Sequence, residues 1–116
     1  MLNHHRFHKD SFSLPLRGLL HLLVLKALCE KPMKGIDIKK YISEKFGLSV
    51  PSAAVYVVLK ALEDRGLVYA KWSEDSEGTR VKLYYVTSEG KEYLKEKIEA
   101  IKSIKKILDY ILEEVS

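Results

Sequence analysis

The chain has 116 residues, of which 47% are hydrophobic and 31% charged, and its formal net charge is +4. This length allows one domain with one core, and the hydrophobic content excludes an intrinsically disordered protein. The single cysteine, Cys29, excludes an internal disulfide and fits a reducing compartment. The longest apolar stretch, around residues 19–28, is interrupted by His21 and Lys26 and is too short to span a membrane. The first residues do not resemble a signal peptide, so we expect a soluble cytoplasmic protein with no membrane partner.

The positive charge is concentrated in the first three quarters of the sequence. Residues 88–116 contain 6 lysines and 7 acidic residues, whereas residues 1–87 contain 14 lysines and arginines against 9 acidic residues. This excess of positive charge favours a polyanionic partner. A solvated lysine-rich surface would give the same count, so charge alone does not separate the two interpretations.

The first predicted helix spans residues 15–30. Residues 1–12 show no periodicity and are interpreted as a flexible arm, after which Ser13 can cap a helix with Pro15 in its first turn. Leucine and valine occupy nearly every side of this helix, so a single domain body would leave one of its faces uncovered. We expect that face to be covered by the last helix of the chain or by a second subunit.

A helix-turn-helix is predicted next. A helix over 35–46 ends at Gly47, which suits the left-handed position after a helix C-terminus. The following helix is predicted over 51–65, with Ser49 as a suitable cap and Pro51 in the opening turn. Two short helices joined by a tight glycine-containing turn are typical of this motif. Its second helix carries a core stripe at helical spacing, formed by Val55, Val58, Leu59 and Leu62.

A β-hairpin and a long helix complete the predicted fold. After Gly66, for which a positive φ is expected, strands over 67–72 and 80–86 flank an acidic turn at 73–79. Thr87 can cap a helix that is predicted to continue to the end of the chain. The fold class is therefore mainly α with a small β-hairpin, a winged helix-turn-helix over 13–87 followed by a long dimerisation helix over 88–116.

The length of the last helix predicts a homodimer. About 28 residues rise roughly 42 Å as a helix, whereas the preceding residues form a body only about 26 Å across. The end of the helix would overhang this body and expose apolar side chains, which a second copy could bury. The predicted dimer-interface residues are Leu16, Leu20, Leu23, Ile101, Ile104, Leu108, Ile111, Leu112 and Val115.

Three stretches of the sequence resemble the PadR family of winged-helix transcriptional regulators, in the short form with a single C-terminal helix. They run from Arg17 to Gly35, from Val55 to Val68 and from Tyr84 to Gly90. Two departures are Ile36, where the family usually has tyrosine, and residues 53–57, where it usually reads Gly-Thr-Leu-Tyr-Pro. The usual operators of the family are therefore not assumed.

The resemblance implies a function and partners. Members act as homodimers on near-palindromic operators in double-stranded DNA and usually repress transcription. Some respond to small aromatic or drug-like effectors at the dimer interface. The chain is accordingly predicted to be a DNA-binding regulator and repressor, with a small aromatic effector as a further partner.

The helix over 51–65 presents its second face to the predicted DNA. Lys60 can neutralise a phosphate, and Ser52 and Tyr56 can donate to phosphate oxygens. This face has no Arg, Asn or Gln for bidentate base contacts, and Ala53 and Val57 offer only methyl groups, which suit thymine. We therefore expect affinity from the DNA backbone and specificity from DNA shape and a few thymine methyls. The alternatives are a packed tyrosine and an ordinary solvated lysine.

The hairpin offers further cations at its base. Strand alternation places Arg80 and Lys82 on one face of the hairpin. The tip of the hairpin is acidic and would be repelled by phosphate, so phosphate contact is expected near the strand bases. Cross-strand pairing of these cations with the acids of the tip is the alternative, and Trp72 is predicted to pack beneath the wing. The full predicted DNA-binding set is Lys34, Ser49, Ser52, Ala53, Tyr56, Val57, Lys60, Lys71, Arg80 and Lys82.

No enzyme is predicted. The sequence contains no Gly-rich phosphate loop, no Cys/His metal pattern and no candidate triad, and the histidines of the arm fit a flexible tail better than a metal site. No cofactor or metal is expected. The alternative function is a winged-helix protein-interaction module in a larger assembly, from which salt-dependent duplex binding would distinguish a DNA-binding regulator.

Overall fold

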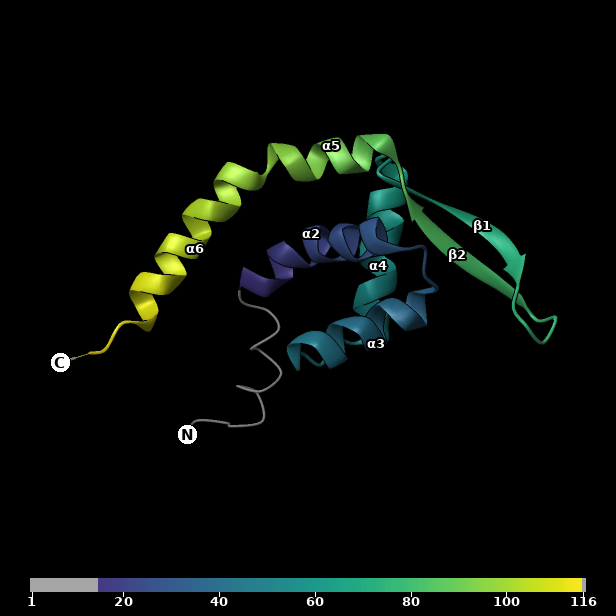
Figure 1. Ribbon diagram of the computed structural model, residues 1–116, viewed down its shortest axis with the longest axis horizontal. Coiled ribbons are helices and arrows are strands. Elements are labelled where there is room, and N and C mark those ends of the chain that lie inside the picture. Colours follow the sequence, from purple (N-terminus) through teal and green to yellow (C-terminus); the bar gives the residue numbers. More distant parts are fainter. Residues whose placement is uncertain (1–14, 116) are drawn as a thin grey trace.

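The computed structural model describes residues 15–115 and the side chains from residue 19 onward, so the predicted arm over 1–12 lies outside the described residues. Within this part the order of elements is α2 (Pro15–Glu30), α3 (Gly35–Phe46), α4 (Ser52–Asp64), β1 (Val68–Glu74), β2 (Arg80–Val86), α5 (Ser88–Glu96) and α6 (Ile98–Leu112). Helices α2, α3 and α4 pack together, the hairpin projects from one side, and α5 and α6 form an arch that passes over α2 (Figure 1). The predicted class, a mainly α winged helix-turn-helix, is confirmed.

The helix-turn-helix consists of α3 and α4. Gly47 ends α3 with φ 64°, and its N–H donates to the Ser43 carbonyl at 2.8 Å, as expected for a left-handed helix end. Helix α4 begins later than predicted, because Pro51 takes the N-cap position with an extended backbone and no side-chain cap. Ser49 lies two residues before this cap, so its predicted capping role is wrong. The Pro51 carbonyl accepts the first helical hydrogen bonds, from Ala54 and Val55.

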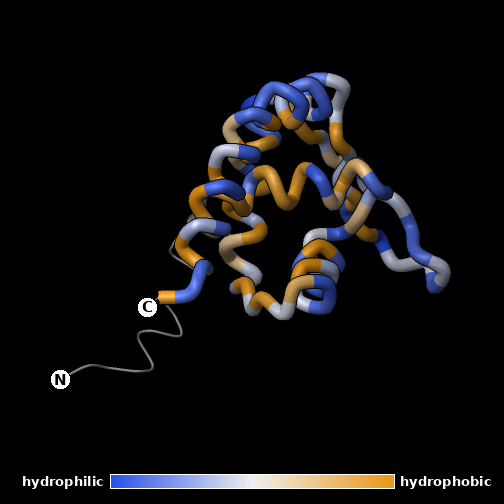
Figure 2. Tube along the Cα trace, turned by 60° about the vertical axis from the view of Figure 1, so that its left-hand side comes forward, coloured by the Kyte–Doolittle hydropathy of each residue, from blue (hydrophilic) through white to orange (hydrophobic). Residues whose placement is uncertain are grey.

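One hydrophobic core lies where α2, α3, α4 and the base of the hairpin meet. Figure 2 shows hydrophobic stretches of the trace on the inner sides of these helices and hydrophilic stretches at the wing tip. The predicted stripe of α4 is buried here. Leu20 belongs to the same core and is only 3% exposed, so the prediction that it contacts a second subunit is wrong. The most deeply buried side chains are Val24, Leu25, Ile38, Ile42, Val50, Val55, Leu59, Leu62 and Val68.

The wing is a regular antiparallel hairpin that is joined to the body. Its register runs from Val68 opposite Val86 to Glu74 opposite Arg80, so β1 extends two residues beyond the predicted strand. Next to β2, Met33 exchanges two backbone hydrogen bonds with Tyr84, at 3.3 and 2.9 Å. The loop between α2 and α3 therefore fastens the base of the wing to the helices.

The C-terminal region is two helices and not one. Thr87 caps α5 as predicted, since its Oγ1 accepts the Gly90 N–H at 3.0 Å. The helix then ends at Glu96, where the Lys97 N–H donates to the carbonyl of Leu94, three residues back. This tighter turn bends the chain, and α6 continues in a new direction (Figure 1). The prediction of one continuous rod is wrong, and the bend contains no proline or glycine that could have indicated it.

Candidate nucleic-acid interface

The exposed face of α4 carries the residues that were predicted to meet DNA. Ala53, Tyr56, Val57 and Lys60 are exposed, and Ser52 at the start of the helix is half-buried. Val57 is apolar, yet 67% of its surface is exposed. This face lies opposite the buried stripe of the helix, as a recognition helix requires.

Tyr56 is held against the first helix of the motif. A Cβ placed on Gly35 would lie 2.5 Å from the Cε1, Cζ and hydroxyl oxygen of its ring. Only glycine therefore fits at the start of α3 without displacing the ring. The side chain is nevertheless 46% exposed. Packing and solvent exposure coexist in this residue, and its outer edge remains available to a ligand.

Lys60 is already engaged within α4. Its Nζ lies 2.9 Å from Asp64 Oδ1, and this hydrogen bond raises the pKa of Lys60 and keeps it charged. Both side chains are more than half exposed, and a surface pair of this kind contributes little to stability. Lys60 can leave Asp64 for a phosphate at little cost, but Asp64 offsets part of its positive potential.

Lys39 is a candidate that the sequence analysis missed. It extends from α3 to the start of α4, where its Nζ donates to Ser52 Oγ at 3.3 Å. This places a cation at the N-terminal end of α4. No local pattern in the sequence indicates this contact, because it depends on how α3 and α4 approach each other.

The wing divides its cations between two faces. Trp72 pairs with Lys82 across the strands, and the guanidinium carbon of Arg80 lies 4.6 Å from the centre of the indole. Lys71 lies on the opposite face, where its Nζ is 5.7 Å from the ring of Tyr85. The predicted wing contact therefore consists of two cations on one side and one on the other. Arg80 and Lys82 lie at the outer end of the hairpin, opposite Glu74 and Trp72, so their predicted position at the strand bases is wrong.

Trp72 does not pack beneath the wing as predicted, since it is 59% exposed. The alternative for Arg80 and Lys82, pairing with the acids of the tip, is also absent from the described part of the chain, where neither residue takes part in an ion pair. The tip itself is ordered by Asp75, whose carboxylate accepts the backbone N–H groups of Thr79 and Glu77 at 2.9 Å each. These hydrogen bonds lower the pKa of Asp75 and keep the tip acidic.

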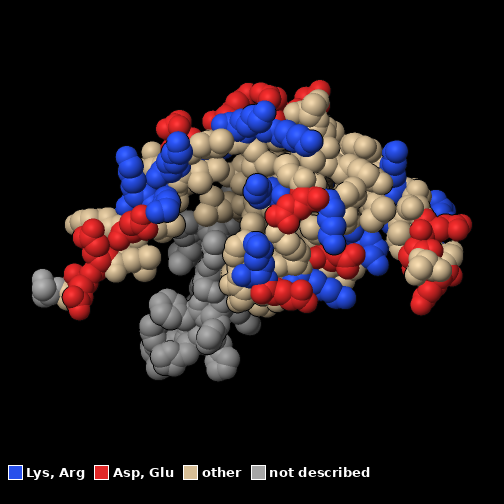
Figure 3. All heavy atoms as spheres, viewed as in Figure 1, with Lys and Arg blue, Asp and Glu red and all other residues tan. Residues whose placement is uncertain are grey.

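Lys34 links the wing to the helix-turn-helix. It is the N-cap residue of α3, its Nζ lies 3.9 Å from Asp37, and its charge contributes to the lowered pKa of Asp75. Figure 3 shows lysine and arginine side chains beside the wing and over α3, with acidic side chains gathered at the wing tip. Acidic side chains also lie among the cations over the body, so the surface there carries mixed charge (Figure 3).

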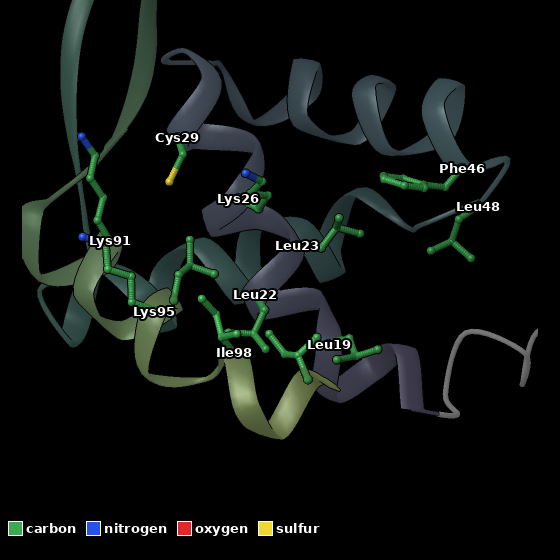
Figure 4. A pocket seen from close by; sticks show the side chains of 12 residues that line it. Leu19, Leu22, Leu23, Lys26, Cys29, Phe46, Leu48, Lys91, Lys95 and Ile98 are labelled. Atoms are coloured by element: carbon green, nitrogen blue, oxygen red, sulfur yellow. The ribbon is translucent and has the colours of Figure 1, made fainter. Parts of the chain in front are cut away.

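A second feature is an apolar groove on the other side of the molecule. It has a volume of about 780 Å³ and lies between α2 and the arch of α5 and α6, with lysines along its edge (Figure 4). Leu23, a predicted interface residue, lines it, whereas the side chain of Leu16 lies outside the described residues. The lining residues are Leu19, Leu22, Leu23, Lys26, Cys29, Phe46, Leu48, Lys91, Leu94, Lys95, Ile98 and Ile101.

The helix beside this groove exposes most of its apolar side. No residue of α6 is buried, and its main packing partner is α5. Among the predicted interface residues near the C-terminus, Ile101 and Ile104 are half-buried. Those that follow Ile104 become more exposed toward the end of the chain. The exposed fractions are 40% for Leu108, 64% for Ile111, 80% for Leu112 and 92% for Val115.

Residues 24–96 match the model of the transcriptional regulator PadR-like family. The chain belongs to this family. A protein of unassigned function from Lysinibacillus sphaericus is 32% identical to this PadR-like chain over 100 residues, which cover 84% of the chain and 92% of the relative. Regulation of transcription through DNA is therefore the function of the chain at the level of the family.

Solved structures show the same relationship to PadR-like proteins. A protein from Thermoplasma acidophilum that is assigned as a transcriptional regulator superposes with a TM-score of 0.79 at 33% identity, covering 87% of this chain and 97% of its own. A PadR family transcription regulator from Clostridium difficile gives a TM-score of 0.71 at 29% identity, with 82% and 99% covered. The segment matched by the PadR-like family model includes the helix-turn-helix, the wing and α5, and it ends before α6.

Between residues 15 and 115, no helix has both the length and the apolar character that crossing a membrane requires.

Proposed function

We propose that the chain is a homodimeric repressor that binds a near-palindromic DNA operator through α4 and the wing. The observations that carry the proposal are the exposed, apolar-tipped face of α4 and, on the outer half of the wing, Arg80 and Lys82, two cations that form no ion pair in the described residues. Family membership supports the DNA-binding part. The dimer, the operator symmetry and the direction of regulation are our inference.

The backbone contacts of the proposed complex come from both sides of α4. Lys39 and Lys60 border the two ends of the exposed face, and Arg80, Lys82 and Lys34 extend the basic surface toward the wing. Such contacts fix position and supply salt-dependent affinity but carry no base information.

Specificity has to arise from the remaining side chains. Ala53 and Val57 project methyl groups, which suit the thymine methyl in the major groove. With no bidentate side chain on this face, we infer that the shape and deformability of the operator contribute much of the discrimination. Ser49 and Ser52 remain proposed backbone contacts near the start of α4. Lys71, on the other face of the wing, is a weaker candidate because it is separated from Arg80 and Lys82.

The proposed dimer uses α6 and the apolar groove. The end of α6 exposes a row of apolar side chains, and the groove between α2 and α5 offers apolar walls of matching character. A two-fold axis would allow each copy to place its α6 against the groove of the other. The proposed interface contains Leu19, Leu22, Leu23, Ile101, Ile104, Leu108, Ile111, Leu112 and Val115, without Leu20.

Charge supports the same arrangement. Lys26, Lys91 and Lys95 line the groove. The last residues of the described chain include Glu113 and Glu114, so the end of a partner's α6 would bring acidic groups toward these lysines. The small aromatic effector that the resemblance implies would have to share this apolar groove with the partner's α6. Effector binding would then act on the geometry of the dimer.

Duplex binding as a function of salt tests the proposed function. The full chain is titrated into labelled genomic duplexes at several salt concentrations, and its mass in solution is measured in parallel. We expect a dimer whose log affinity falls steeply with log salt, with a slope equivalent to several neutralised phosphates. A chain that binds no duplex at low salt would contradict the proposal and favour the protein-interaction module. Selection of bound fragments from the genome then reveals whether the operator has two-fold symmetry.

A further inference from the structure

The only tryptophan of the chain lies in an unexpected place. Trp72 is on β1, near the outer end of the wing, and 59% of its surface is exposed. It is not part of the hydrophobic core, which ends at the base of the hairpin. An exposed indole gains little from packing, so its position calls for another explanation.

Two cations gather on this indole. The guanidinium of Arg80 lies 4.6 Å from the ring centre, and the Nζ of Lys82 lies 6.0 Å from it. Lys82 is also 5.6 Å from the ring of Tyr84, which is buried at the base of the same wing face. Arg80, Lys82 and Trp72 therefore form a cluster on one face of the hairpin, which we call the wing cluster.

The register makes this arrangement informative. Arg80 is paired directly with Glu74, and the acidic tip follows immediately, so an ion pair with a carboxylate would be the simple outcome for its guanidinium. In the structure the guanidinium lies over the indole instead. Stacking uses the flat face of a guanidinium, whereas hydrogen bonds to phosphate use its edge. The indole thus holds the guanidinium of Arg80, whose N–H groups take part in no ion pair within residues 19–115.

We propose that Trp72 is a positioning residue for DNA binding: it holds Arg80 and Lys82 on one face of the wing, ready to contact the phosphate backbone. This inference rests on the proposed function and adds a residue that the sequence analysis assigned to packing. DNA would find two cations already ordered, so less side-chain freedom is lost on binding. The ring also needs to be aromatic, because an aliphatic side chain cannot hold a cation over its face.

The test compares Trp72→Leu and Trp72→Phe in the full chain, using labelled genomic duplex over a range of salt concentrations. We expect Trp72→Leu to weaken binding about tenfold and to lower the salt slope by about 1, because Arg80 is released toward the acidic tip. Trp72→Phe keeps an aromatic face and should stay within about threefold of the parent chain. Tyr69→Leu, on the opposite face of the hairpin, is the matched control and should leave the slope unchanged.

A double-mutant cycle separates positioning from a direct contact. In an Arg80→Ala, Lys82→Ala background, Trp72→Leu should have almost no further effect, since there are no cations left to position. The melting temperature of each variant is measured alongside its affinity. If Trp72→Leu lowers the melting temperature strongly, Trp72→Thr takes its place in the comparison of affinity and salt slope with the parent chain. Threonine is well suited to a strand and has no aromatic ring.

The outcomes are distinct. Parent-like affinity and slope in Trp72→Leu would overturn the inference and leave the proposed function intact. Weaker binding with an unchanged slope would also overturn it, because the indole would then contact DNA itself. A parent chain that binds no duplex would remove the proposed function and this inference together.

Discussion

Helices α4 and α6 carry apolar side chains at the same helical spacing, yet these side chains have opposite environments. In α4 the stripe is buried, with Val55 and Leu62 at 0% exposure, whereas in α6 the stripe reaches 80% exposure at Leu112. The difference lies in what surrounds each helix. Helix α4 is enclosed by α2, α3 and the wing, and α6 leaves the body after the bend at Lys97. The same pattern builds a core in one region and offers a binding surface in the other.

The largest effect is expected in the enclosed helix. Leu59→Ala removes a side chain that is 1% exposed and should lower the free energy of unfolding by about 2–5 kcal/mol. Denaturant unfolding at two protein concentrations measures this, and the loss should be the same at both. Leu112→Ala on α6 is the matched variant, and its effect should appear only where the dimer forms. A large loss from Leu112→Ala in a dilute monomer would contradict the comparison.

The exposed stripe is tested by making it charged. Leu108→Lys combined with Ile111→Lys should yield a folded monomer, because burying two lysines in an interface is unfavourable. Operator affinity should then fall by about 100-fold, since the second half-site no longer contributes. Sedimentation measures the mass in solution, and duplex titration measures the operator affinity. Lys102→Ala, on the polar side of α6, is the control, and an unchanged mass for the double variant would remove the proposed interface.

The cations of α4 and the wing should have smaller and unequal effects. Arg80→Ala should weaken duplex binding several-fold at all sequences and lower the salt slope by about 1. Lys60→Ala should have a weaker effect, because Asp64 already offsets its charge. Conversely, Asp64→Ala should strengthen binding. If either cation changed only the preferred sequence and not the slope, its assignment to the DNA backbone would be wrong.

The start of α5 gives a test of local stability. Thr87→Val removes the hydroxyl that accepts the Gly90 N–H and donates to the Gly66 carbonyl. We expect a loss of about 1 kcal/mol, which is typical of a helix cap. Thermal or denaturant unfolding measures it, with Thr87→Ser as the variant that keeps the hydroxyl. A loss in Thr87→Ser together with no loss in Thr87→Val would show that the methyl group, and not the cap, matters.

The smallest effect concerns pH. Burial lowers the pKa of His21, and the nearby charge of Arg65 lowers it further. The folded state therefore resists protonation, so stability should be complete above the unfolded pKa of about 6.5 and should decrease as the pH falls below it. His21→Gln should flatten this slope between pH 7.5 and 5.5. A variant with glutamine at His4, His5 and His8 should retain it, and loss of the slope in that variant would contradict the assignment.

Parts of the candidate site followed from the sequence because they depend on near neighbours in the chain. The exposed face of α4 is set by the helical spacing of Val55, Val58 and Leu62, which a single helix determines. Lys39 beside Ser52 and the stack of Arg80 on Trp72 did not follow, because they depend on how two elements approach each other. No local pattern specifies which of several nearby partners a long side chain selects.

The sequence by itself determined the order of elements and several of their ends. Gly47 and Gly66 adopt positive φ, and Thr87 caps α5, because each of these depends on a few consecutive residues. Only the tertiary structure decided that Leu20 faces the core and that the chain bends at Lys97. Burial and helix direction depend on all the surfaces that meet at a point, and those surfaces come from segments far apart in the sequence.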